Sequence, residues 1–191
     1  MTCQIVLGNK GTRLMETDRL ILRRFKPGDA EDMFKNWAKD SEVCKFLSWH
    51  PHKDVRETEK IVGDWINVYT NDNSYNWAIE LKGVDEIIGQ ISVISLDERY
   101  CSCSVGYNVS RLYWGKGIMT EALKAVITYL FEEIGINRIE ARHNTENPAS
   151  GRVMEKAGMK LEGIMRQAKI DKNGEFYDLA VYSILKSDLM L

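Results

Sequence analysis

Two glycines flank a lysine in the segment Gly115–Gly117, which is suited to hold a phosphate group. The segment follows a run of alternating apolar and polar residues, Cys101–Val109, that is typical of a half-buried strand. It precedes Ile118–Ile134, in which apolar residues recur at every fourth position, as in an amphipathic helix. Glycine allows a ligand to approach the backbone closely, and the first N–H groups of a helix are unpaired and partly positive. The segment therefore suits a phosphate or pyrophosphate, although Gly-x-Gly is also an ordinary turn.

This glycine segment differs from two common phosphate-binding motifs. It lacks the Gly-Lys-Ser/Thr of a Walker A loop at the required spacing, and the third glycine of a dinucleotide fingerprint is missing. A second segment, Asn147–Met159, follows another alternating stretch, Arg138–His143, and reads N-P-A-S-G-R-V-M-E-K-A-G-M. The pair of motifs in this order is more specific than either motif alone.

Together the two segments resemble the GNAT superfamily of acetyl-CoA-dependent N-acetyltransferases. The sequence W-G-K-G-I-M-T-E-A at Trp114–Ala122 is similar to the family's pyrophosphate loop, and Asn147–Met159 is similar to the element that follows it. Both forms look closest to the branch of ribosomal-protein N-terminal (alanine/serine) acetyltransferases. The resemblance implies acetyl-CoA as co-substrate, no metal, and direct attack of a primary amine on the thioester. A protein or peptide N-terminal α-amine is the favoured acceptor. The alternatives are a small amine (polyamine, amino sugar or antibiotic) and a non-catalytic acetyl-CoA-binding module.

The resemblance also implies which residues bind coenzyme A. Backbone amides from Gly115 to Thr120 would hold the pyrophosphate, although Leu112 stands where many relatives have Gln or Arg. A backbone N–H of Asn108 or Val109 would bind the oxyanion where two strands splay apart, with Gly106 at a bulge. The expected coenzyme-binding residues are Asn108, Val109, Gly115, Lys116, Gly117, Ile118, Met119, Thr120, Asn147, Ser150 and Arg152.

The catalytic residues are less well defined by the sequence. Many relatives have a Tyr acid at the position of Met154, so Ser150 is the remaining candidate acid in this motif; its alternative role is a helix N-cap. The usual Glu base is replaced by Ser104. Glu80 and Glu140 lie on neighbouring predicted strands and are alternatives, as is positioning of the amine without a base.

The acceptor is expected near Trp49, His50 and Trp65, because this region forms the acceptor cleft in the family. The simpler interpretation of the Ser48–His52 loop is that one buried indole pins it.

Periodicity and turn residues predict the remaining elements. The resemblance implies a mixed α/β GNAT fold in a single domain, 1–191, with an irregular lead-in over 1–17. This fold has a twisted, mostly antiparallel sheet of about seven strands, a V-shaped splay between its two central strands, and about four helices. The predicted strands are 20–25, 77–81, 87–96, 101–109, 138–143, 159–170 and 176–185, and the predicted helices are one with Asp29 as N-cap, a short turn at 41–47, 55–69, 118–134 and 150–157.

Composition excludes several classes of protein. The 191 residues are 44% hydrophobic, with a formal net charge of −2 and no basic stripe, so nucleic acid is not an expected partner. No apolar run is long enough to span a membrane and no signal-peptide core is present, so a cytoplasmic monomer or homodimer is expected. The four cysteines, Cys3, Cys44, Cys101 and Cys103, are expected to be reduced thiols rather than metal ligands.

Overall fold

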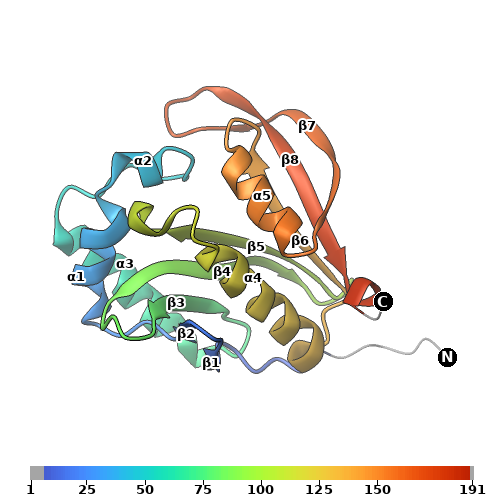
Figure 1. Cartoon of the computed structure of the whole chain (residues 1–191), viewed down its shortest axis with the longest axis horizontal. Coiled ribbons are helices and arrows are strands. Elements are labelled where there is room, and N and C mark those ends of the chain that lie inside the picture. The colour runs from blue at the N-terminus through green and yellow to red at the C-terminus, as the bar shows by residue number, and fades with distance from the viewer. Residues whose placement is uncertain (1–6, 190–191) are drawn as a thin grey trace.

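A computed structural model describes residues 7–189, so Cys3 and the first part of the lead-in lie outside the described residues. One eight-stranded sheet has the order β1-β2-β3-β4-β5-β6-β8-β7 (Figure 1). All neighbours are antiparallel except β5 and β6, which are parallel. The strands are β1 Met15–Glu16, β2 Leu20–Arg23, β3 Asn76–Leu81, β4 Ile87–Asp97, β5 Ser102–Val109, β6 Arg138–Asn144, β7 Lys160–Ile170 and β8 Phe176–Leu185.

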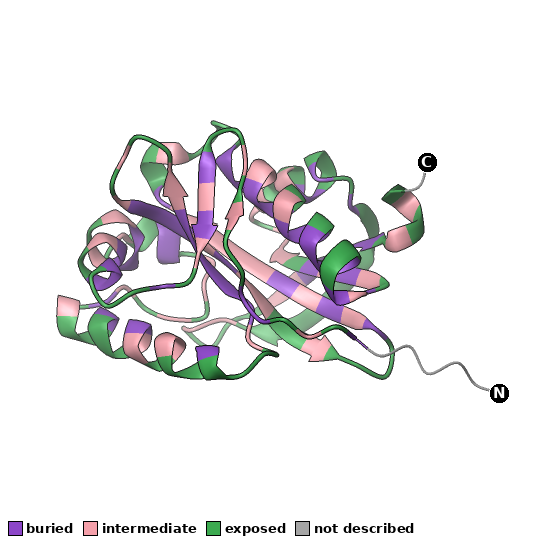
Figure 2. Cartoon of the chain, turned by 90° about the horizontal axis from the view of Figure 1, so that it is seen from below, coloured by how far each residue is buried: buried purple, intermediate pink, exposed green. Residues whose placement is uncertain are grey.

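The helices form two layers, one on each face of this sheet. Apolar residues of α4 and α5 pack with the sheet into one core, and those of α1 and α3 form a second core on the opposite face. Figure 2 shows the buried positions gathered on the strands and on the helix faces that turn toward them. The helices are α1 Asp29–Met33, α2 Ser41–Cys44, α3 Val55–Asn67, α4 Ile118–Tyr129 and α5 Pro148–Lys156, with π-helical continuations η1 Phe34–Ala38 and η4 Leu130–Ile134 and 3-10 turns η2 Val68–Thr70, η3 Arg111–Tyr113 and η5 Lys186–Leu189.

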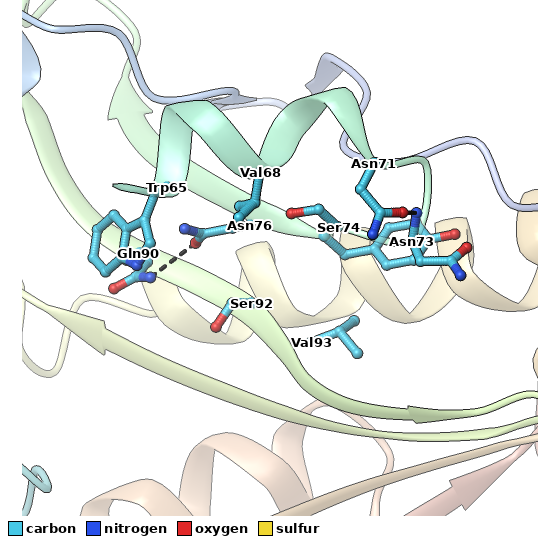
Figure 3. A pocket seen from close by; sticks show the side chains of 10 residues that line it. Trp65, Val68, Asn71, Asn73, Ser74, Asn76, Gln90, Ser92 and Val93 are labelled. Carbon is cyan, nitrogen blue, oxygen red and sulfur yellow. Dashed lines mark hydrogen bonds between the residues drawn. The ribbon is translucent and has the colours of Figure 1, made fainter. Parts of the chain in front are cut away.

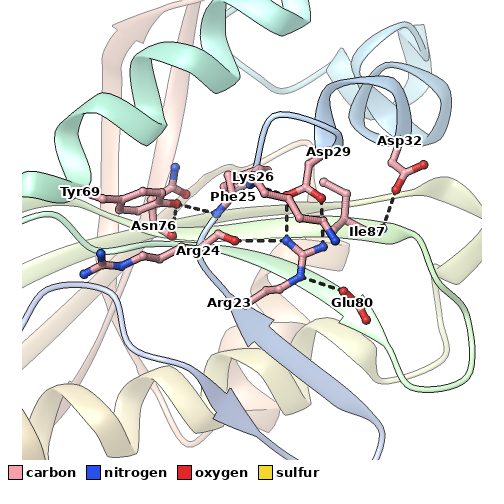
Figure 4. Close-up of polar contacts among 10 residues, drawn as sticks. All are labelled: Arg23, Arg24, Phe25, Lys26, Asp29, Asp32, Tyr69, Asn76, Glu80 and Ile87. Carbon is pink, nitrogen blue, oxygen red and sulfur yellow. Dashed lines mark hydrogen bonds and ion pairs between the residues drawn. The ribbon is translucent and has the colours of Figure 1, made fainter.

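These elements confirm the predicted mixed α/β fold, with one more strand than expected and with the predicted turn at 41–47 forming the short helix α2. The extra strand is β1, which lies in the predicted irregular lead-in and pairs with Ile21 and Leu22 of β2. Asp29 is not an N-cap, since Gly28 takes that position and the Asp29 carboxylate instead accepts from Arg23 and from the Lys26 N–H. Figure 4 shows the Arg23 guanidinium held between Asp29 and Glu80.

The sheet splays between β5 and β6, as the resemblance implied. The two strands pair over only four residues, from Ser102↔Arg138 to Val105↔Ala141. Beyond Val105, β5 continues to pair with β4 up to Val109, so one edge of its last residues is open. The predicted bulge at Gly106 is wrong in its position. The extra residue is Ile94 in β4, and a Cβ at Gly106 would lie 2.5 Å from the Ile94 Cδ1 atom.

Within residues 7–189, no helix has the length and apolar character needed to cross a membrane. No group of three or more His, Cys, Asp or Glu side chains in this part of the chain is arranged to hold a metal ion.

Candidate active site

A cleft of about 1040 Å³ occupies the splay between β5 and β6. Its floor is the end of β5, and the glycine turn with the first residues of α4 closes one end. The start of α5 forms one wall, and α2 with the β7–β8 hairpin forms the opposite mouth. Of the predicted coenzyme-binding residues, ten line this cleft and Lys116 does not.

The glycine turn has the backbone geometry expected of a phosphate-binding loop. Gly115 and Gly117 have φ angles of +73° and +75°, a region that other residues adopt only with strain. Gly117 is the N-cap of α4, and the buried side chains of Ile118 and Met119 fix the first turn of the helix to the core. The first N–H groups of α4 therefore face the cleft without side-chain competitors. The Lys116 ammonium lies over the Tyr113 ring, 5.4 Å from its centroid.

Hydrogen bonds from Arg19, which sequence patterns did not reveal, fix the glycine turn and the first turn of α4; we call this contact the Arg19–Glu121 brace. Arg19, between β1 and β2, donates from Nη1 to the Lys116 carbonyl oxygen at 3.0 Å and from Nε to Glu121 at 2.7 Å. Glu121 also accepts from the Thr17 hydroxyl at 2.6 Å. Burial acts to raise the pKa of Glu121, but these hydrogen bonds lower the pKa overall, so the carboxylate stays charged. The partners are about a hundred residues apart in sequence, so no local signal points to them.

The two backbone candidates for the oxyanion face opposite ways. Ser110 N–H donates to the Ile88 carbonyl of β4, and successive residues of a strand point to opposite neighbours. The Asn108 N–H therefore faces β4, and the Val109 N–H faces the open side of β5. The structure thus favours Val109 over Asn108. The Asn108 side chain instead donates to Gln90 at 3.3 Å, and its Oδ1 atom is buried without a partner among the described residues.

Ser150 lies in the cleft wall with a partner that sequence reasoning missed. Asn147 is the N-cap of α5 and accepts from the Ser150 N–H at 3.3 Å, so Ser150 is not the cap. The Tyr107 hydroxyl lies 3.0 Å from both the Ser150 Oγ and the Ser150 carbonyl oxygen. Burial raises the pKa of Tyr107, and the hydrogen bond to Ser150 only partly opposes this, so Tyr107 is a protonated donor at neutral pH. Its place directly after Gly106, on the apolar face of β5, is the signal that could have identified it.

Neither predicted base is free to act. Glu80 pairs with Arg23 at 2.8 Å and is not among the residues that line the cleft. Glu140 does line it, but Arg138 and Arg142 lie 2.7 and 3.0 Å from its oxygens. Burial acts to raise the pKa of Glu140, and the two arginines more than offset this, so the pKa is lowered. Ser104, at the position of the usual Glu base, also lines the cleft, but its hydroxyl group is not basic.

Among residues 7–189, one imidazole lines the cleft, that of His143, and its Nε2 atom is buried and faces away from the open space. His143 donates from Nδ1 to the Asn144 carbonyl oxygen at 2.7 Å in the tautomer that this bond requires. The Nε2 atom is buried and lies 2.7 Å from where a Cβ on Gly151 would be. His143 therefore packs against α5 and is not placed to take a proton from an amine.

The predicted acceptor residues do not meet at this cleft. Trp49 packs against His52, with ring centroids 4.9 Å apart and the ring planes inclined at 40°. His50 is exposed, and Trp65 packs on Phe25 beside a different cavity. The mouth is lined instead by Phe46, Leu47 and Ser48, which follow the C-cap residue of α2, Lys45.

A hairpin tip bridges the mouth of the cleft. The Lys172 ammonium, at the β7–β8 turn, donates to the carbonyl oxygens of Cys44, Lys45 and Trp49. Figure 1 shows this hairpin reaching across toward α2. The β7–β8 hairpin tip, held by Lys172, thus covers the mouth of the cleft, and we call this contact the Lys172 strap.

The splay has room for an extended arm and the glycine turn suits a phosphate group, which is the pair of sites that an acyltransferase needs to hold an acyl-carrier thioester. Residues 19–160 match the family model described as an acetyltransferase (GNAT) domain. The chain is 32% identical over 173 residues to the uncharacterised N-acetyltransferase YoaA of Bacillus subtilis, covering 91% of this chain and 97% of that protein. It is 28% identical to the ribosomal protein uS5-alanine N-acetyltransferase of Escherichia coli, covering 78% and 79%. The microcin C7 self-immunity acetyltransferase MccE, solved with acetyl-CoA and AMP, superposes with a TM-score of 0.79 at 22% identity, covering 88% and 93%.

The chain therefore belongs to the GNAT acetyltransferase family. It is an acetyl-CoA-dependent N-acetyltransferase that transfers an acetyl group to an amine.

Proposed function

We propose that the acceptor is the N-terminal α-amine of a protein or peptide. The observation that carries this proposal is the state of the carboxylates in the cleft. Glu140 is committed to two arginines, while Glu42 and Asp97 line the cleft but are exposed. A side-chain base tuned to neutral pH would be a histidine that faces the open space or a buried carboxylate without a cationic partner. The described part of the cleft has none, so the amine must supply its own neutral fraction.

This requirement discriminates strongly between amines. An α-amine with a pKa of about 7.7–8.0 is roughly 10–17% neutral at pH 7. A lysine-type amine with a pKa of about 10.4 is only about 0.04% neutral, which is a difference of a few hundred-fold. The uS5-alanine N-acetyltransferase of Escherichia coli is consistent with the same choice, because its name specifies acetylation of an alanine and the amine of alanine is its α-amine.

The residues of the cleft suggest how the transfer proceeds. Coenzyme A would lie with its pyrophosphate on the N–H groups that follow Gly117 and its thioester beside Val109. The neutral amine attacks the thioester carbon, and the Val109 N–H donates to the oxygen as it becomes negative. The C–S bond then breaks, the thiolate takes the Ser150 hydroxyl proton, and the proton lost by the new amide nitrogen restores Ser150. The one proton of the Tyr107 hydroxyl has two acceptors within 3.0 Å, the Ser150 carbonyl oxygen and the Ser150 Oγ atom. When Tyr107 donates it to Oγ, the serine proton is free to face sulfur.

An acceptor panel tests this function. Three peptides of one sequence would be incubated with enzyme and acetyl-CoA: one with a free α-amine and a free lysine, one with only the α-amine free, and one with only the lysine free. Polyamines and amino sugars complete the panel. Mass spectrometry should show acetylation of both peptides with a free α-amine, at that position, and almost none at lysine. Acetylation confined to polyamines or amino sugars would refute the proposal and support the small-amine alternative.

A further inference from the structure

A second cavity, of about 340 Å³, lies between the end of α3 and the middle of β4. Its walls carry the side chains of Trp65, Asn76, Gln90 and Ser92, and no charged residue lines it within the described part of the chain. Figure 3 shows these side chains directed into the space under α3. The volume is within the range of small-ligand sites, and its polar groups converge from two elements.

In this cavity, the amide oxygens of Asn76 and Gln90 already accept hydrogen bonds, whereas several N–H groups have no acceptor among the described residues. The Asn76 Oδ1 atom already accepts from Gln90 Nε2 at 2.8 Å, and the Gln90 Oε1 atom already accepts from Asn108 at 3.3 Å. Among the described residues, the Asn76 amide nitrogen, the second Gln90 N–H and the Trp65 indole N–H donate to no protein group. Asn76 is also buried, with 7% exposure. Uncharged donors beside an indole suit a neutral ligand that offers carbonyl oxygens.

The second cavity adjoins the acetyl-transfer cleft through one cross-strand pair. Gln90 of β4 lies directly opposite Asn108 of β5, and their side chains are hydrogen-bonded. Gln90 lines the second cavity, whereas Asn108 lines the cleft next to Val109. This hydrogen-bonded pair lies between the two cavities, so an acceptor that extends past it from the thioester would reach the second cavity.

We infer that this cavity is a subsite for the acceptor, and that it binds backbone carbonyl oxygens of the residues that follow the acetylated one. The inference rests on the proposed function, because it assumes a peptide acceptor. Recognition through uncharged donors makes no demand on the peptide side chains, so the subsite selects for chain length rather than for sequence.

A length series tests the subsite. Alaninamide, dialaninamide and trialaninamide present an alanine α-amine with zero, one or two further residues. For the wild-type enzyme, kcat/KM should rise at least tenfold from alaninamide to trialaninamide. In Gln90→Leu the donors are replaced by a side chain of similar size, and this ratio should fall to less than about threefold. Ser92→Ala is a milder second variant, and Asn67→Leu, on the exposed side of α3, is a matched control that should keep the wild-type ratio.

The ratio separates a subsite from a structural effect. If Gln90→Leu lowers kcat/KM equally for all three amides, Gln90 acts only by holding Asn108, and the subsite is refuted. If the wild-type ratio is near one, the subsite is also refuted while acetylation of α-amines stands. If none of the three amides is acetylated but small amines are, the proposed function itself fails. Calorimetry with coenzyme A confirms that each variant retains the folded cleft.

Discussion

Gly117 offers a test in which backbone strain and charge are separable. A Cβ at this position would have only one close neighbour, the Arg19 Nη2 atom at 3.6 Å, so no steric clash arises. The cost of Gly117→Ala is then the cost of a φ of +75° for an L-residue, about 1–2 kcal/mol. At 2–4 °C per kcal/mol for a chain of this size, the melting temperature should fall by about 2–8 °C. Gly83→Ala is the matched control, with a φ of +82° and open space around the added carbon.

The two alanine variants should differ only in coenzyme binding. Gly83 lies in the β3–β4 turn and lines neither cavity, whereas Gly117 lies where the pyrophosphate must approach the backbone. Gly117→Asn and Gly117→Asp extend the test, because both residues tolerate the left-handed region and have almost the same shape. They differ by one negative charge. At about 4 Å from a phosphate charge that difference is worth roughly 1–4 kcal/mol, or about fivefold to several hundred-fold in Kd.

Calorimetry with coenzyme A at low and high salt measures this difference. The Asp variant should bind at least about fivefold more weakly than the Asn variant at low salt, and the gap should shrink as salt screens the charges. Equal dissociation constants for Asp and Asn at low salt would show that no phosphate lies at the N-terminus of α4.

Three further predictions concern other parts of the molecule. Ser150→Ala and Tyr107→Phe should each lower turnover by more than they weaken coenzyme A binding. Asn147→Ala should instead lower the stability of the folded protein by about 1 kcal/mol, because the helix loses its N-cap. If Ser150→Ala releases free thiol as fast as the wild type, Ser150 has no role in the mechanism. Burial lowers the pKa of His52 below its usual 6.5, so the unfolded chain binds a proton that the folded chain does not, and stability is lost as pH falls through this range. Melting temperatures from pH 7.5 to 5.5 should therefore fall more steeply for the wild type than for His52→Gln, and parallel curves would contradict this reasoning. Lys172→Met removes the ammonium that donates to the carbonyl oxygens of Cys44 and Trp49. Amide hydrogen exchange at 171–175 should therefore accelerate while α4 stays protected. Identical exchange at the hairpin tip in the variant and the wild type would show that these contacts do not hold the hairpin.

Much of the fold was predictable because its strands and helices carry strong periodic patterns. The alternation over Cys101–Val109 and the four-residue recurrence after Gly117 identify β5 and α4 and place a glycine turn between them. Weak local signals explain the misses. β1 has only two residues and exists because it pairs with β2, and the bulge at Ile94 depends on the register between β4 and β5.

The site was predictable only where one local motif carried it. The glycine turn and the Asn147–Ser150 segment are continuous in sequence, and both line the cleft. The Arg19–Glu121 brace, the Tyr107–Ser150 pair and the Lys172 strap each join residues that are 43 or more positions apart, so no window of sequence contains them. The sequence did not show that Trp49 packs against His52 or that Trp65 lines the second cavity and not the cleft, because an aromatic residue near a predicted cleft gives no sign of which way its ring turns. Trp65 packs its ring on Phe25 in the second core.

The short pairing between β5 and β6 divides the sheet into two blocks of strands. Strands β1–β5 and strands β6, β8 and β7 form two blocks, and the sheet ladder that joins them has four residue pairs at one end. A pantetheine arm lying in the splay would hold the two blocks at a fixed opening from the inside. Saturating coenzyme A at about a hundred times its dissociation constant would add roughly 2.7 kcal/mol to the stability of the folded state. The carrier would thereby be a structural member of the enzyme as well as its substrate, and each release of product would briefly loosen the joint between the blocks.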